Sequence, residues 1–157
     1  MARTVDIPLE HLPHIDEHGV LVDAPRERVW DALVQVVPGA FGGGGSLRAA
    51  RMLGCSETER SGEPGRIGST IPGFVVARVI KPAALALEGQ HRFSRYGLIF
   101  SLDPVGEDQT MLRAETRAEF PGFKGKVYRA LVIGTNGHVI VVNRLLKSVK
   151  KRAERSV

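Results

Sequence analysis

The chain has little of several residue types that mark particular classes of protein. Cys55 is its only cysteine, which excludes an intrachain disulfide and a zinc site built on paired cysteines, and we expect an incidental thiol, not a catalytic one. No apolar run approaches the ~18 residues of a membrane span, and residues 1–10 lack the apolar core of a signal peptide. We therefore expect a cytoplasmic protein without stable membrane insertion.

What is present is ordinary for a globular protein. The chain has 157 residues, of which 43% are hydrophobic and 25% charged, and this length predicts a single domain over residues 1–157. The net charge is +5, but five cations gather at the C-terminus, where they suit a helix end. No aromatic side chains are interleaved with them, so we favour a solvated helix end over a nucleic-acid site or an anionic membrane. The five are Lys147, Lys150, Lys151, Arg152 and Arg155.

The last third of the chain predicts one long amphipathic helix, from Lys124 to Glu154. At 100° per residue, one set of side chains falls within about 100°, the width of a stripe that faces a core. A helix of this length needs a large surface beneath it, and a sheet would provide one. The stripe consists of Val127, Leu131, Gly134, His138, Val141, Val142, Leu145 and Val149.

The middle of the chain predicts β-strands. Apolar and other residues alternate with period 2 in several runs, and the polar face of the last run is expected to meet solvent, so that the sheet is covered on one side only. A turn is expected over 103–108. The predicted strands cover residues 14–23, 74–80, 85–93, 96–102 and 112–120.

A shorter helix is predicted after the first strand. Pro25 suits a first helical turn with Asp23 or Ala24 at the cap, and Pro38-Gly39 is expected to stop the helix. The glycines 42–45 that follow are expected in a surface loop or a flap at a cavity mouth.

The segment from Ala24 to Trp30, an Ala-Pro-x-x-x-Val-Trp sequence, resembles the START/Bet v 1-like superfamily. This superfamily, also called SRPBCC, includes polyketide cyclase and dehydrase-like proteins, and the resemblance covers nearly the whole chain. It implies an α+β helix-grip fold, in which a seven-stranded antiparallel sheet curves around a long C-terminal helix and encloses an apolar pocket. The superfamily includes both binding proteins and enzymes, so the resemblance assigns neither an activity nor site residues.

Five polar residues are placed near the interior by the pattern of the chain. His138 lies in the middle of the helical stripe, and a buried imidazole without a partner would cost about 1–3 kcal/mol. A few polar groups in an apolar hollow are typical of a small-molecule site, although ordinary cores also hold such groups. The candidate ligand-binding residues are His91, Tyr96, Thr116, Tyr128 and His138.

Motifs for catalysis are lacking. The glycine run is not followed by Gly-Lys-Ser or Gly-Lys-Thr, and there is no Gly-x-Ser-x-Gly elbow. His14, Asp16 and His18 alternate on a strand, which would put all three on one face. We favour a polar patch there over a metal site, and we expect no metal and no cofactor.

The leading hypothesis is a protein that binds a small hydrophobic or amphipathic ligand between sheet and helix. The first alternative is a polyketide cyclase or dehydratase that uses His91 or His138 as acid or base. The second is an interaction module, a homodimer for instance, because Val132, Ile133 and Ile140 lie on the outer side of the predicted helix.

Overall fold

The computed structural model describes residues 9–40, 62–63, 65–71, 73–91, 94–120, 122, 125–127, 130 and 137–155. Helices and strands follow one another in the α+β order expected. They are η1 (Leu9–His11), β1 (His14–Val22), α1 (Arg26–Ala40), β2 (Thr70–Ile71), β3 (Phe74–Ile80), β4 (Ala84–His91), β5 (Ser94–Val105), β6 (Gln109–Glu119) and α4 (Gly137–Arg155).

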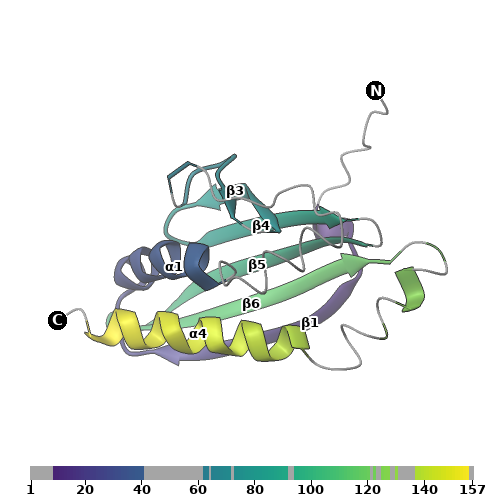
Figure 1. Ribbon diagram of the computed structural model, residues 1–157. Helices are drawn as coiled ribbons and strands as arrows, with labels where there is room; N and C mark the ends of the chain where they lie inside the picture. Colours follow the sequence, from purple (N-terminus) through teal and green to yellow (C-terminus); the bar gives the residue numbers. More distant parts are fainter. Residues whose placement is uncertain are drawn as a thin grey trace.

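The strands form one curved antiparallel sheet with the order β1-β6-β5-β4-β3-β2. Both helices lie on the same face of it (Figure 1). The antiparallel sheet and its helical cover are as predicted from the sequence. Within the described residues the sheet has six strands, where the resemblance implies seven, and the short β2 was not predicted.

The inner face of the sheet, which the helices cover, follows the predicted alternation. Leu98, Phe100 and Leu102 on β5 are all buried. The register places Leu112 and Ala114 of β6 opposite Leu102 and Phe100, and directly opposed residues of an antiparallel pair share a face. These strands therefore present a continuous aliphatic and aromatic surface to the helices.

Helix α1 begins one residue later and ends later than the sequence suggests. Pro25 occupies the cap position, because its carbonyl accepts hydrogen bonds from the backbone N–H groups of Arg28 and Val29. The helix continues through Pro38 to Ala40. A proline this close to the end forfeits only one backbone hydrogen bond, and the ring of Pro38 is buried.

Helix α4 buries a different arc of its surface from the predicted stripe. Val142, Leu145 and Val149 are buried as expected. Leu146 and Ala153 are buried as well, because α4 packs against α1 in addition to β1 and β6. The arc is therefore turned toward α1.

Two predicted members of that stripe are exposed. Val141 is 40% exposed and Val127, in the helical residues 125–127, is 47% exposed. Their placement in the core was wrong. Leu131, Gly134 and the side chain of His138 lie outside what the structure describes, as do the glycines 42–45 and Cys55. No helix in the described part of the chain is long and apolar enough to cross a membrane.

The outer face of the sheet is not wholly open to solvent, contrary to the sequence prediction. Leu9 and Leu12 are buried there against Ala86, with Ile99 packed beside them. The Arg117 guanidinium donates hydrogen bonds to the carbonyls of Glu10, at 2.8 Å, and Leu12, at 2.9 Å. The segment 9–12 thus forms an N-terminal strap across one end of the outer face.

Candidate functional site

Polar side chains interrupt the aliphatic inner face toward the start of β1 and the end of β6. Asp16 and His18 alternate in phase with Val20 and Val22, which pack in the core. The register pairs His18 with Ala114 and Asp16 with Thr116. Because paired residues share a face, Asp16, His18 and Thr116 all point to the helical side of the sheet. We call these three residues the inner-face cluster.

Asp16 and His18 form a half-buried pair. His18 Nε2 lies 3.4 Å from Asp16 Oδ2, and the two side chains are 28% and 23% exposed. A carboxylate beside one ring nitrogen favours the tautomer that carries its hydrogen on that nitrogen. The Nδ1 atom of His18 is then left as a hydrogen-bond acceptor.

Thr116, one of the predicted site residues, has a buried hydroxyl that finds no hydrogen-bond partner in the described part of the chain. Leaving a buried polar group unpaired costs about 1–3 kcal/mol. Its neighbours on the same face, Ala114 and Ala118, are small and buried. A ligand or a water molecule with a polar atom near Thr116 would remove this cost.

His14 does not join the inner-face cluster. An irregularity between His14 and Asp16 shifts the register of β1 against β6. The His14 ring therefore turns to the outer face, where its Nδ1 lies 3.0 Å from Glu115 Oε1. The expectation that three alternating residues share one face was wrong, because a bulge moves each residue beyond it to the opposite side. Within the described residues, no group of three or more metal-ligating side chains is present.

Tyr96, a second predicted site residue, makes its hydrogen bond and its ring contact with other residues of the protein. Its hydroxyl donates a hydrogen bond of 2.7 Å to the carbonyl of Gly73, and its ring stands edge-on to Phe74 at 5.2 Å. The ring passes directly over Gly89, where an added Cβ would come within 2.3 Å of it. The ring of Tyr96 therefore lies over β4, toward β3, and its contact with a ligand stays a prediction.

The architecture matches solved structures, although no protein-family model and no curated protein matches the sequence. A truncated norcoclaurine synthase from Thalictrum flavum superposes with a TM-score of 0.58 at 15% identity, over 94% of this chain and 99% of that one. A protein from Chromobacterium violaceum gives 0.57 at 13% identity, over 92% and 100%. A conserved protein from Geobacillus kaustophilus gives 0.53 at 16% identity, over 89% and 95%.

The chain therefore shares the fold of these structures, which confirms the helix-grip fold that its resemblance to the START/Bet v 1-like superfamily implied. At these identities the likeness establishes the fold and leaves the activity open.

The remaining predicted residues of this helix-grip protein stay predictions. His91 ends β4, where its backbone pairs with Ser94, and His138 follows the first residue of α4. The side chains of both, and Tyr128 as a whole, lie outside the described part of the chain.

Asp16 and His18 were not among the predicted site residues. In the sequence they alternate with the inward-pointing Val20 and Val22, and this alternation was the signal that could have placed them in the site.

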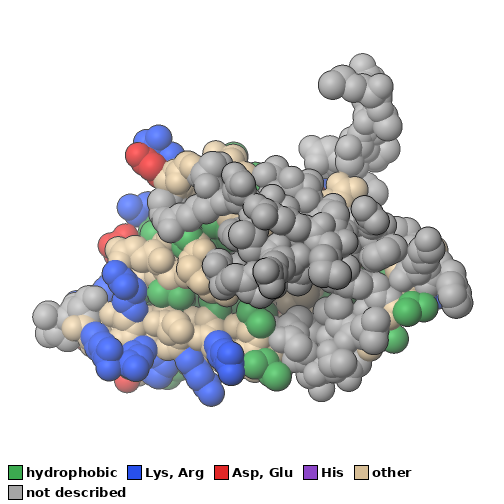
Figure 2. Space-filling view, in the orientation of Figure 1, with side chains coloured by type: hydrophobic (Ala, Val, Ile, Leu, Met, Phe, Trp, Pro, Cys, Tyr) green, Lys and Arg blue, Asp and Glu red, His purple; other side chains and the backbone are tan. Residues whose placement is uncertain are grey.

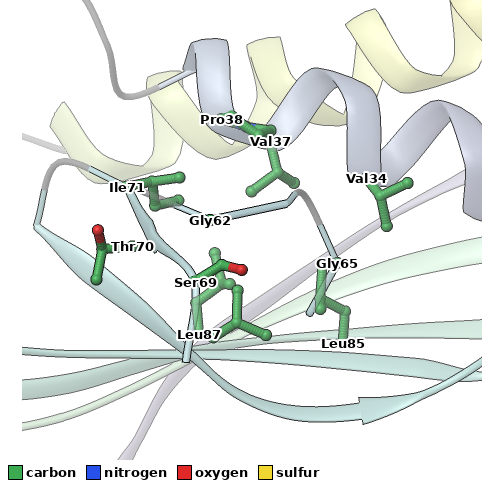
Figure 3. A pocket seen from close by; sticks show the side chains of 11 residues that line it. Val34, Val37, Pro38, Gly62, Gly65, Ser69, Thr70, Ile71, Leu85 and Leu87 are labelled. Carbon is green, nitrogen blue, oxygen red and sulfur yellow. The ribbon is translucent and has the colours of Figure 1, made fainter. Parts of the chain in front are cut away.

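A separate hollow lies between α1 and strands β2 to β4 (Figure 3). Val34, Val37 and Pro38 face Leu85 and Leu87 across it, and its free space is about 20 Å³. This is room for about one water molecule. Ser69 at its edge already donates its hydroxyl to the carbonyl of Glu63 at 2.6 Å. The hollow is therefore a packing gap of the helix grip, too small for an organic ligand.

Proposed function

We propose that this protein binds a small apolar or amphipathic ligand against the inner face of the sheet, with the polar end of the ligand at the inner-face cluster. The observation that carries the proposal is the buried, unpartnered hydroxyl of Thr116 beside the Asp16–His18 pair, on a face that is otherwise aliphatic. An apolar surface with a few convergent polar groups is the usual form of a small-molecule site.

The chemistry of the cluster suggests the polar group of the ligand. The Thr116 hydroxyl can donate or accept a hydrogen bond, and His18 Nδ1 can accept one. An alcohol or phenol on the ligand would satisfy both. One structure with this fold, of norcoclaurine synthase, contains dopamine and hydroxybenzaldehyde; it has a TM-score of 0.56 and 16% identity to this chain. We infer by analogy a ligand of comparable size with a hydroxyl group on an apolar body.

The test is a screen of phenols, aromatic polyketides and fatty alcohols by thermal shift and native mass spectrometry, followed by two threonine variants. Thr116→Val removes the orphaned hydroxyl at nearly constant volume and should weaken binding about 3- to 30-fold, the equivalent of about one hydrogen bond. Thr110→Val is the matched control, because the Thr110 hydroxyl is buried but already donates to the Ala24 carbonyl at 2.9 Å. Equal affinities for the two variants would place the ligand elsewhere.

A second candidate function is acid–base catalysis on the bound ligand. It is favoured by the Asp16–His18 pair, because a carboxylate lies 3.4 Å from the imidazole on a half-buried face, and a histidine is the commonest general acid or base. His18→Gln should then abolish turnover of the identified ligand while binding persists. Retained turnover would exclude His18 and leave His91 and His138 as the predicted acids or bases.

We also propose a cytoplasmic location and a homodimer. Ile140 is exposed, as the interaction hypothesis requires, while Val132 and Ile133 lie outside the described residues. Light scattering that shows a monomer at micromolar concentration would exclude a stable dimer.

A further inference from the structure

The solvent side of α4 carries a row of cations. Arg144, Lys147, Lys151 and Arg155 are all exposed, and their spacings of three, four and four residues place them on one face of the helix. Figure 2 shows Lys and Arg side chains along α4, at the lower edge of the view. We call these four residues the α4 basic stripe.

The α4 basic stripe has no counter-charge among the residues that the structure describes. Within the described residues, none of its four side chains forms an ion pair or a hydrogen bond. Lys150, one residue away on a different face, does pair with Glu154 and also donates to the carbonyl of Leu21 at 2.9 Å. Like charges three and four residues apart disfavour a helix, so the stripe works against the stability of α4.

A solvated helix end does not explain the whole stripe. The helix macrodipole favours cations within about the last turn, which accounts for Arg155 in the last turn of α4. Arg144 and Lys147 lie two or more turns earlier. The helix macrodipole therefore does not explain why these two cations lie on the stripe.

Two exposed aliphatic residues adjoin the stripe. Ile140 is 53% exposed and Val141 is 40% exposed. Ile140 lies four residues, and Val141 three residues, before Arg144, so both share its side of the helix. The same surface thus combines unpaired cations with apolar side chains.

We propose that the α4 basic stripe, with Ile140 and Val141, docks this protein on the surface of an anionic phospholipid bilayer. The cations would meet the lipid phosphates while the two aliphatic side chains enter the interface between headgroups and acyl chains. A nucleic acid offers the cations the same phosphates but no apolar layer for Ile140 and Val141. The stripe also lacks the aromatic side chains that stack on bases.

Co-sedimentation of the full chain with vesicles tests this proposal. Binding to vesicles of 70% phosphatidylcholine and 30% phosphatidylglycerol is expected at about 50 mM salt, with strong weakening at 500 mM salt. Each cation near such a surface contributes about fivefold to the partition coefficient. Lys147→Gln/Lys151→Gln should therefore weaken binding about 30-fold, and Ile140→Ser should weaken it at both salt concentrations.

The matched control removes two cations from the opposite edge of the sheet. Arg66 and Lys81 are exposed residues beside β2 and β3, whereas α4 contacts β1 and β6. Arg66→Gln/Lys81→Gln gives the same net charge and should bind nearly as the unchanged protein does. Equal losses in the two double variants, equal binding to pure phosphatidylcholine vesicles, or tighter binding to duplex DNA than to the anionic vesicles at equal salt would each overturn the proposal.

Discussion

The two ends of the inner face differ although the same strands build them. At one end, Val22 of β1 and Leu112 of β6 are fully buried in the core. A few residues away on the same face, Asp16 and His18 are about a quarter exposed, and Thr116 has an unpaired hydroxyl. We call the end with Val22 and Leu112 the filled end, and the end with the inner-face cluster the polar end. The filled end stabilises the fold, whereas the polar end holds polar groups that lower its stability. Ligand binding requires both, because an orphaned polar group persists only where the rest of the fold compensates for it.

The largest effect is expected from a cavity in the buried core, in the row of residues that pairs Phe100 with Ala114 and Ala114 with His18. Phe100 is completely buried, and Phe100→Ala should lower the free energy of unfolding by about 3–5 kcal/mol. Urea denaturation followed by circular dichroism measures this. Phe100→Leu, which keeps most of the volume, should cost clearly less. A loss below about 1 kcal/mol for the alanine variant would mean that the buried core around Phe100 does not stabilise the fold.

The N-terminal strap should contribute the next largest effect. Leu12 is 2% exposed on the outer face, and Leu12→Ala should cost about 2–3 kcal/mol. Leu21, on the outer face of β1 and 38% exposed, provides the control, and Leu21→Ala should cost less than about 1 kcal/mol. Equal costs would show that burial by the strap does not stabilise the sheet.

These elements also show what could be predicted of the fold. Period-2 alternation identified the inward positions of β5 and β6, because it is a local property of the sequence. The strap could not be predicted in this way, since Leu9 and Leu12 are isolated apolar residues in a short segment without a period. Val141 was misplaced for a related reason: which arc of a helix is buried depends on neighbours such as α1, which the helix's own pattern does not reveal.

At the polar end, replacing a threonine by valine should change the stability of the protein in the opposite direction from the same replacement in the core. Thr116→Val removes an unpaired buried hydroxyl and should leave the ligand-free protein unchanged or up to about 1 kcal/mol more stable. Thr110→Val breaks the buried hydrogen bond to Ala24 and should cost about 1–2 kcal/mol. Thermal denaturation of both variants measures the contrast. A clear destabilisation by Thr116→Val would indicate that its hydroxyl is satisfied.

The candidate site was only partly predictable. Thr116 was predicted as a site residue because it lies in phase with small residues, and its role in ligand binding stays a prediction. Asp16 and His18 alternate in the sequence with inward-pointing valines. The bulge that separates His14 from them depends on how β1 pairs with β6, a partner about 100 residues away. Likewise, the hydrogen bond from Tyr96 to Gly73 joins residues 23 positions apart, and no local period encodes it.

The smallest effect is expected for Glu154, whose side chain links α4 to Asp23, the residue that follows β1. Its carboxylate accepts hydrogen bonds from Lys150 and, at 3.0 Å, from the backbone N–H of Asp23. The Lys150 hydrogen bond, followed by the one from Asp23, lowers the pKa of Glu154 below its ordinary value of 4.5. A carboxyl group with a lowered pKa in the folded state stabilises that state above its unfolded pKa, and this contribution is lost as the pH falls through the folded pKa.

Glu154→Gln should therefore lower the melting temperature slightly at pH 7, and the difference should vanish as the pH falls through the lowered pKa of the folded state. Glu107→Gln, in the exposed turn between β5 and β6, should leave the melting temperature unchanged at both pH values. High salt should also reduce the Glu154 difference, because the contact is near the surface. A melting-temperature difference that persists in acid would show that Glu154 acts through packing and not through its charge. The link between α4 and Asp23 would then depend on shape and not on the charge of Glu154.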